Sequence, residues 1–277
     1  VIPGEVERFY KSISKDSLPT IADQYVYAQI TKFPKSMTAA KQRTRERLLD
    51  MRERVITGSA KFENLARMYS QDPGTMMRGG EMDPSPLASL DPSFAAALEN
   101  MKPGQISEVV ESQFGFHIIQ LLDKRGQLYH FRHILLRPVY TTEELGESLN
   151  LLDSIANLIH KDSLTFEKAA LQYSDDAQSK MNGGIVSNHD ILERFNAFDA
   201  KLTVPKFLKE DFGRFKSLDD YNGLNRLKPG EVSDAYLTED MLGNQMAKIV
   251  KLVEIIPTHT ASLNEDYLRL EEMALQD

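Results

Sequence analysis

Few residues in this chain combine a reactive type with a setting suited to chemistry. His117 lies beside a glycine in the apolar run Gly115-Phe-His-Ile-Ile, and Asp72 lies in the turn Ser70-Gln-Asp-Pro-Gly. A lone histidine in a strand is more often a structural hydrogen-bonding group than a catalyst. An aspartate in such a turn can also simply bond the nearby backbone. These residues could therefore supply a polar hydrogen-bonding cluster, and the purely structural interpretation stays open for both.

Most other kinds of reactive site are excluded by the sequence. The six histidines are scattered, with no His-x-x-x-His pair that would indicate a metal site. There is no Gly-x-Ser-x-Gly elbow and no phosphate loop, and Gly79-Gly80 is too short for a nucleotide cradle. The absence of cysteine excludes disulfides, thiol catalysis and cysteine-based metal sites. We expect neither a metal nor a cofactor.

The composition is that of a globular protein. The chain has 277 residues, 41% hydrophobic and 27% charged, a length that suits two domains. With a net charge of −8 and no basic stripe, nucleic acid is not an expected partner. No run approaches the roughly 18 apolar residues of a membrane span. The chain starts at Val1 without a methionine or a signal peptide, so we expect a processed or trimmed fragment.

One stretch of the chain is written twice. Residues 62–80 (FENLARMYSQDPGTMMRGG) and 166–184 (FEKAALQYSDDAQSKMNGG) share their phenylalanine, alanine, tyrosine, serine, aspartate and double glycine. Each pair differs by 104 in number, as in 166 − 62 = 104. Phe62, Leu65, Ala66 and Tyr69 recur at helical spacing, which predicts an amphipathic helix followed by a shaped loop. A repeat of this kind indicates two related domains in tandem.

The elements around the first copy predict an α+β domain. We expect a strand at 25–33, a long charged helix at 38–57, the repeated helix, a short helix at 91–101, and strands at 106–110 and 116–122. Helices and strands do not alternate regularly, which favours a small antiparallel sheet with helices packed on it.

The second copy repeats this order after a very short join at 124–127. Its expected strands are 128–138, 232–237 and 245–255, with a long helix at 142–161. The closing Lys-Pro-Gly turn lies at Lys102 in one copy and at Lys228 in the other, so about 22 residues are inserted, mainly within 190–227. We therefore expect an N-terminal helix and linker at 1–22, a first domain at 23–126, a second at 127–256 and a C-terminal helix at 257–277.

The combined pattern resembles a known family. Phe-x-x-Leu-Ala-x-x-Tyr-Ser-x-Asp, the double glycine, Lys-Pro-Gly-Gln-Ile-Ser and Phe-Gly-Phe-His-Ile-Ile together resemble the parvulin (PpiC-type) peptidyl-prolyl isomerases. Two such modules flanked by helices are similar to the SurA-type periplasmic folding factors of bacteria. The resemblance implies two tandem parvulin-like, FKBP-like domains, and 1–22 as the tail of an N-terminal chaperone domain that would be a partner within the same chain.

The resemblance also assigns residues to a site in the first copy. Leu90 and Phe94 would form the apolar cup for the proline ring, and Met82, near its rim, is a further candidate for binding the substrate. The polar cluster would use His117, Asp72 and Ser112, with Gln29 where parvulins commonly place a first-strand histidine. The interpretation of Phe94 as an ordinary core residue stays open.

The second copy departs from the family pattern in a complementary way. His133 and Asp176 stand at the expected places, but Gln245 takes the position of the later histidine, and Phe207 is the expected ring-gripping aromatic. Glutamine can donate and accept hydrogen bonds without titrating, so the fold can persist while the site changes. Each of these residues can also be structural. The first domain is the better candidate for an active site, and the second is expected to be weak or inactive.

Two functions follow from the resemblance. The first is a prolyl cis–trans isomerase and chaperone that assists the folding of exported, outer-membrane proteins in the periplasm, with unfolded or proline-containing polypeptides as partners. The second is a non-catalytic peptide-binding chaperone built from degenerate parvulin domains. The two are compatible, because a cup for proline binds peptides whether or not it isomerises them.

Overall fold

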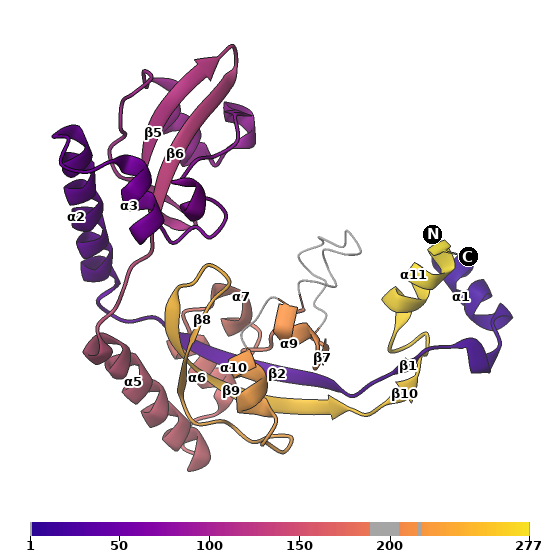
Figure 1. Ribbon diagram of the computed structural model, residues 1–277. Helices are drawn as coiled ribbons and strands as arrows, with labels where there is room; N and C mark the ends of the chain where they lie inside the picture. The colour runs from indigo at the N-terminus through magenta and orange to yellow at the C-terminus, as the bar shows by residue number, and fades with distance from the viewer. Residues whose placement is uncertain (1, 189–204, 215–217, 277) are drawn as a thin grey trace. The chain divides into compact units, whose positions relative to one another are not determined.

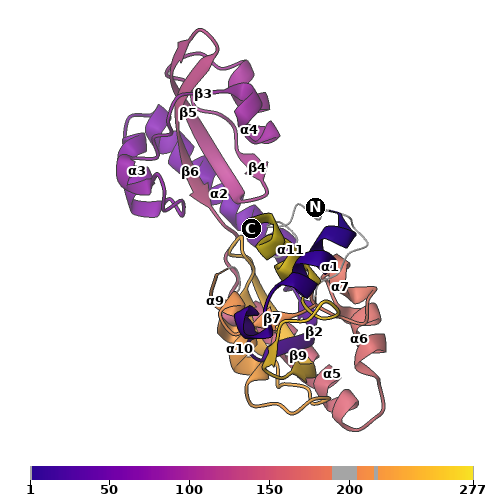
Figure 2. The ribbon, with the colours of Figure 1, turned by 90° about the vertical axis from the view of Figure 1, so that its right-hand side faces the viewer.

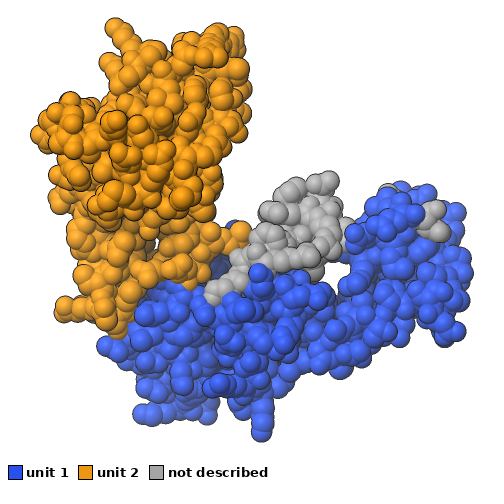
Figure 3. All heavy atoms as spheres, in the orientation of Figure 1, with its two compact units in different colours: residues 1–32, 148–238, 246–277 blue, residues 33–147, 239–245 orange. Residues whose placement is uncertain are grey.

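The computed structural model describes residues 2–188, 205–214 and 218–276 as two compact units (Figures 1 and 3). Unit 1 comprises Val1–Lys32, Ser148–Thr238 and Met246–Asp277, and unit 2 comprises Phe33–Glu147 and Glu239–Gln245. The expected α+β class is confirmed, with two four-stranded antiparallel sheets and helices packed on them. None of the helices within these described ranges is long and apolar enough to cross a membrane.

Unit 2 is built on the sheet β3-β6-β5-β4. The strands are β3 (Ser85–Pro86), β4 (Val110–Ser112), β5 (Gly115–Arg125) and β6 (Leu128–Leu136). The helices are α2 (Met37–Ile56), α3 (Phe62–Tyr69) and α4 (Pro92–Glu99), with short 3-10 turns at η2 (Met76–Arg78) and η3 (Leu87–Ser89). Along β5 the side chains alternate between two cores, since Phe116 and Ile118 pack with α2 and α3, and Ile119 and Leu121 pack with α4. Helices α3 and α4 lie on opposite sides of the β5–β6 hairpin (Figure 2).

Unit 1 repeats this plan on the sheet β7-β2-β9-β8. Its strands are β2 (Gln24–Lys32), β7 (Phe207–Leu208), β8 (Tyr236–Glu239) and β9 (Gln245–Ile256). Its helices are α5 (Thr142–His160), whose first residues belong to unit 2, and α6 (Phe166–Tyr173), α7 (Ala177–Lys180), α9 (Asp211–Arg214) and α10 (Leu218–Leu224). Of the expected insertion at 190–227, residues 190–204 and 215–217 lie outside the described residues.

The two ends of the chain form a small layer of their own within unit 1. Helix α1 (Pro3–Ser12), the 3-10 turn η1 (Lys15–Ser17), β1 (Thr20–Ile21), β10 (His259–Thr260) and α11 (Tyr267–Gln276) make it up. Strand β1 pairs with β10, and Val6, Ile21, Ala261 and Leu270 form one buried cluster. The amphipathic helix α11 thus buries Leu270 against helix α1.

The strand pairing differs from the division expected from the repeat. Strand β2, from the first copy, pairs along its length with β9 of the second copy, from Gln24↔Ile256 to Lys32↔Ala247. Strand β6, the first strand of the second copy, pairs with β5 of the first, from Arg125↔Leu128 to Phe116↔Leu136. Residues 33–147 therefore form a unit inserted within the other one, in place of domains at 23–126 and 127–256.

Strand β6 pairs with β5 because the connection between these two strands is very short. Only Gly126 and Gln127 lie between β5 and β6, and two residues span at most about 7 Å of extended chain. A strand joined by so short a turn must fold back onto its neighbour as a hairpin, since another sheet is out of reach. Strand β2 is then left to complete the sheet of the second copy.

Candidate active site

Two histidines from neighbouring strands form the centre of the candidate site in unit 2. His117 of β5 and His133 of β6 are both buried, with 1% and 5% of their surface exposed. Their Nδ1 atoms lie 3.1 Å apart, and the rings stack with centroids 5.3 Å apart. The site therefore contains two histidines, where the sequence assigned only His117 to this domain and His133 to the other.

Asp72 anchors this histidine pair from the loop after α3. Its Oδ2 atom lies 2.7 Å from His133 Nε2, and Thr75 Oγ1 donates to the same oxygen at 2.5 Å. The amide of Gly74 donates to Oδ1 at 3.1 Å. The hydrogen bonds from His133 and Thr75 hold the pKa of Asp72 well below its usual range. Asp72 thus caps its turn and orients a histidine at the same time.

Ser112 closes the other end of the network. Its Oγ atom lies 2.7 Å from His117 Nε2. One proton order satisfies every member: Ser112 donates to His117 Nε2, His117 Nδ1–H donates to His133 Nδ1, and His133 Nε2–H donates to the Asp72 carboxylate. The structure therefore links Ser112, His117, His133 and Asp72 in one hydrogen-bonded chain.

An aromatic ring stands directly against the two imidazoles. Phe94 of α4 meets His117 edge to face at 4.6 Å between centroids and His133 at 5.7 Å. Helix α4 begins at Pro92, and the Asp91 side chain accepts from the Ser93 amide, which fixes the first turn. Leu90 and Met82 are partly buried against the same cluster. The structure thus brings together Leu90 and Phe94, expected for the apolar cup, and Met82, expected near its rim.

The apolar surroundings keep His117 uncharged. Burial lowers the pKa of His117 to about 3, and the neighbouring His133 acts in the same direction. His117 is therefore neutral at neutral pH.

This shift predicts acid sensitivity with a definite sign. Between about pH 6.5, the ordinary pKa of histidine, and about pH 3, the unfolded chain binds a proton that folded His117 does not. Stability should fall as the pH drops through this window, by at most about 1.4 kcal/mol per pH unit from this group. Asp72, with its lowered pKa, adds to the loss below about pH 3.8.

Urea unfolding of the chain and of His117→Asn at pH 7, 5.5 and 4.5 isolates this contribution. The variant should lose less stability than the unmodified chain on going from pH 7 to 4.5. Equal losses in the two proteins would contradict the buried neutral imidazole.

In unit 1 the place of His133 is taken by Gln29. Gln29 Nε2 donates to Asp176 Oδ2 at 3.1 Å, and Ser179 Oγ also donates to that oxygen. The backbone N–H of Gln29 donates to Gly184 O at 2.8 Å, just as the backbone N–H of His133 donates to Gly80 O at 2.9 Å. A Cβ on Gly80 would lie 2.2 Å from His133 O, and one on Gly184 2.7 Å from Gln29 O, so both close approaches require glycine. The two loops are equivalent, and Gln29 belongs with Asp176, not with His117.

The place of His117 in unit 1 is taken by Lys248, which the sequence analysis missed. Ile119 faces His133 across the hairpin and Val250 faces Gln29, so the residues two positions earlier, His117 and Lys248, correspond. Gln245, expected at this position, is the first residue of β9 and lies three residues too early.

A carboxylate in unit 1 takes the place of Phe94. Phe94 lies eight residues before Lys102, and Asp220 lies eight residues before Lys228. Asp220, 2% exposed, pairs with Lys248, and its Oδ2 lies 3.1 Å from Nζ. Tyr27 OH and Tyr236 OH donate to Asp220 at 3.1 and 2.8 Å. Burial, and then the charge of Asp220, raise the pKa of both tyrosines well above the usual value. The aromatic–imidazole contact of unit 2 is thus replaced by a buried ion pair.

Phe207, the expected ring-gripping residue of the second copy, lies elsewhere in the core. It belongs to the edge strand β7 and packs on Tyr27 and Phe212, with centroids 5.2 and 5.5 Å away. The common spacing to the Lys-Pro-Gly turn was the signal that could have identified Asp220 instead.

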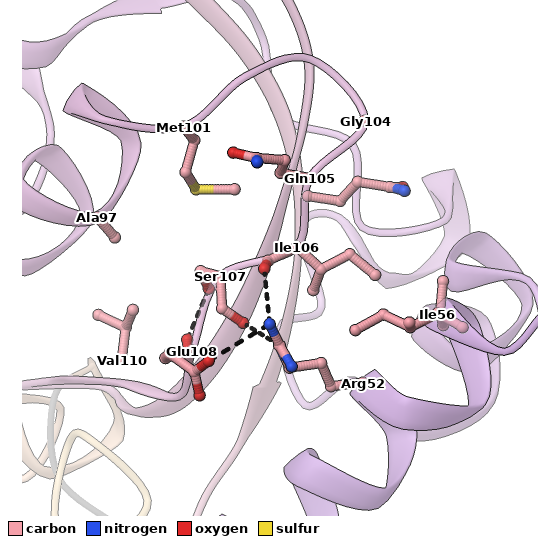
Figure 4. A pocket seen from close by; sticks show the side chains of 12 residues that line it. Arg52, Ile56, Ala97, Met101, Gly104, Gln105, Ile106, Ser107, Glu108 and Val110 are labelled. Carbon is pink, nitrogen blue, oxygen red and sulfur yellow. Dashed lines mark hydrogen bonds and ion pairs between the residues drawn. The ribbon is translucent and has the colours of Figure 1, made fainter.

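Two cavities among the described residues lie away from the histidines. A cavity of about 740 Å³ in unit 2 is lined by residues that include Arg52, Ile56, Met101, Ile106, Ser107 and Val110 (Figure 4). A cavity of about 620 Å³ occupies the equivalent place in unit 1, beside Ile159 and Gly230. Neither is lined by His117, His133 or Phe94, so neither cavity coincides with the candidate site.

Comparison with known proteins places these features in a family. The sequence model of the rotamase family, the PPIC-type PPIASE domain, matches residues 30–123 and 133–207, more than half of the chain. Chaperone SurA of Nitrosospira multiformis is 28% identical over 249 residues, which cover 84% of this chain and 49% of that protein. Chaperone SurA of Bordetella avium is 46% identical over 90 residues, 32% of this chain and 18% of that protein.

The chain spans about half or less of the length of these curated relatives. Among solved structures, the peptidylprolyl isomerase PrsA of Bacillus cereus aligns with a TM-score of 0.28 and 26% identity, over 44% of each chain.

Proposed function

The chain belongs to the family of PPIC-type peptidyl-prolyl isomerases, and we propose that unit 2 isomerises Xaa–Pro bonds of polypeptides at the site of His117, His133 and Phe94. The observation that carries this proposal is the buried pair of histidines, 3.1 Å apart at Nδ1, with the Phe94 ring against both. Such an arrangement joins an apolar surface for the proline ring to a fixed set of hydrogen-bonding groups.

The chemistry asked of this site is a rotation. The barrier for turning a peptide bond is about 18–20 kcal/mol, because the nitrogen lone pair is conjugated with the carbonyl. A site that holds the proline ring on Phe94 and Leu90 and removes water from the amide favours the twisted form, in which this conjugation is lost. Because His117 is neutral, the floor of the cup is uncharged, which reduces the cost of placing an apolar ring there.

Unit 1, in our proposal, does not isomerise proline. A proline ring brought to the equivalent place would meet Asp220 and Lys248 in place of Phe94 and His117. These two groups and the hydroxyls of Tyr27 and Tyr236 satisfy one another, so displacing them would leave charges without partners.

An exchange measurement on the full chain tests the activity. We expect it to accelerate cis–trans exchange of a blocked Ala-Pro peptide, observed by NMR, and Phe94→Ala to lose most of the acceleration. Phe9→Ala, in α1 of unit 1, should retain it. Exchange at the uncatalysed rate in the unmodified chain would refute the proposal.

A chaperone role for exported, outer-membrane proteins in the periplasm is the second candidate. It is supported by the name Chaperone SurA of the relatives and by the replaced site of unit 1, which points to binding without turnover. The clients would be unfolded or partly folded polypeptides. Suppression of aggregation of an unfolded outer-membrane protein should then persist in His117→Ala. An unmodified chain that leaves aggregation unchanged would exclude this role.

A further inference from the structure

His259 lies in the layer formed by the two chain ends, in unit 1. It belongs to β10, which pairs with β1, and its partner across the pair is Ile21. Helix α11 follows β10 along the chain and packs against α1 (Figures 1 and 2). We call α1, β1, β10 and α11 the terminal layer.

Both ring nitrogens of His259 face a hydrogen-bond acceptor. Nε2 lies 2.8 Å from Asp266 Oδ2, and Nδ1 lies 2.9 Å from Pro257 O. A carboxylate and a carbonyl oxygen can only accept, and a neutral imidazole carries a single N–H. Only the protonated ring can donate to both oxygens, so this geometry requires the imidazolium form. The bond to Pro257 O, and then the bond to Asp266, raise the pKa of His259 accordingly.

The other charged groups near His259 come from three elements of unit 1. Glu265, which precedes α11, also favours the protonated ring, and it is itself paired with Lys206, at 2.5 Å. Asp23, which follows β1, accepts from the backbone and the hydroxyl of Thr258, the residue before His259. The ring is thus surrounded by more carboxylates than cations, which suits a positive charge.

Asp266 also fixes the start of α11. Its side chain, 4% exposed, accepts from the backbone N–H of Ser262 at 3.0 Å. Its backbone carbonyl accepts from the N–H of Leu270 at 3.1 Å. Leu270 is the side chain by which α11 enters the buried cluster with Val6 of α1. The contact of Asp266 with His259 therefore connects strand β10 to the turn that orients Leu270.

We propose that His259 and Asp266 form a pH-controlled clasp that holds α11 in the terminal layer. When the ring is protonated, both of its hydrogen bonds form and α11 is docked. Loss of the proton leaves one acceptor opposite a nitrogen lone pair, so one of the two contacts breaks. Helix α11 then opens more often and uncovers the apolar cluster between the two chain ends.

The pH dependence of the clasp is opposite in sign to that of His117. A folded-state pKa raised above the ordinary value of 6.5 contributes stability that is complete below pH 6.5. This stability is lost as the pH rises through the folded-state pKa. The terminal layer should therefore be held most firmly at mildly acidic pH, where the contribution of His117 to unit 2 declines.

Hydrogen exchange of the Leu270 backbone N–H in the full chain tests the clasp. Its protection factor compares the measured rate with that of an unfolded peptide at the same pH, which removes the intrinsic pH dependence of exchange. We expect this factor to fall about threefold to tenfold between pH 6 and pH 8.5, since one unit of pKa corresponds to a tenfold change in an equilibrium constant. An NMR titration of the His259 ring should give a pKa above 6.5.

The variant His259→Asn separates the clasp from other effects of pH, because asparagine does not titrate. Its Leu270 protection factor should stay constant over this range. His160→Asn is the matched control, since His160 ends α5 of the same unit, with Nε2 3.2 Å from Val232 O, and this variant should keep the fall. An equal fall in His259→Asn, a constant protection factor in the unmodified chain, or a His259 pKa of 6.5 or lower would each overturn the proposal.

Discussion

His133→Ala should lower the isomerase kcat/KM on the order of 10²-fold, comparable to the loss of one well-placed hydrogen-bonding group in other enzymes. His133 joins Asp72, at 2.7 Å, to His117, at 3.1 Å. Its removal leaves the buried Nδ1 of His117 without its partner, at a cost of about 1–3 kcal/mol, whereas Asp72 keeps its hydrogen bonds from Thr75 and Gly74. His117 would then lose the contact that fixes its orientation against Phe94.

The matched control for His133→Ala is Gln29→Ala. Gln29 holds the equivalent position in the other copy and bonds Asp176 in unit 1, so activity should stay within about twofold of the unmodified chain. Measuring the activity of both variants by NMR exchange on the same peptide shows whether β6, with His133, or β2, with Gln29, lies beside β5. A loss in Gln29→Ala without a loss in His133→Ala would show that Gln29 completes the site of His117.

Asp220→Ala should be among the most destabilising single substitutions in unit 1, by about 3–5 kcal/mol. The change leaves the Lys248 ammonium buried without its carboxylate and takes the acceptor from the hydroxyls of Tyr27 and Tyr236. The loss in the free energy of unfolding is measured by urea unfolding, followed with a signal that reports on unit 1.

A double variant separates the ion pair from simple packing. Asp220→Ala combined with Lys248→Met removes both charges, so it should recover a large part of the lost stability. The pair Asp175→Ala and Lys32→Met, which breaks a more exposed ion pair of the same unit, should change stability by about 1 kcal/mol or less. A double variant as unstable as Asp220→Ala would contradict the paired arrangement.

The local elements of the fold could be predicted from the sequence. The spacing of Phe62, Leu65 and Ala66 predicted α3, and these three residues are buried in the structure. The proline after Asp91 and the apolar, β-branched run at 116–122 likewise predicted α4 and β5. These signals depend on neighbours a few residues apart, so they survive whatever the rest of the chain does.

The partner of each strand could not be taken from the repeat. Gln29 and His133 hold the same place in their copies, and either strand would fit either sheet by its apolar pattern. The two-residue turn at Gly126 determines the pairing, because it allows β6 to reach only β5. The information was present as the short join, but the order of the repeat suggested two consecutive domains.

The prediction that Gln245 takes the place of His117 in the second copy was wrong, because the two copies were aligned in the wrong register. Gly115 and Gly243 each lie two residues before a polar residue, His117 and Gln245, which suggested that Gln245 replaces His117. Gly104 N donates to Leu121 O and Gly230 N donates to Leu252 O, so Leu121 and Leu252 correspond. The spacing between these partners is 17 residues in one copy and 22 in the other (121 − 104 and 252 − 230), so the hairpin before β9 is five residues longer. Lys248 therefore takes the histidine's place.

The strand pairing itself can be measured directly, because the chain contains no cysteine. Gln120 and Arg132 lie opposite each other on β5 and β6, whereas Ala28 is the counterpart of Arg132 in the first copy. A Gln120→Cys/Arg132→Cys pair should form an intramolecular disulfide on mild oxidation, and an Ala28→Cys/Gln120→Cys pair should stay reduced, as read by mass spectrometry of the digested protein. A disulfide only in the second pair would show that β2, with Gln29, completes the site of His117.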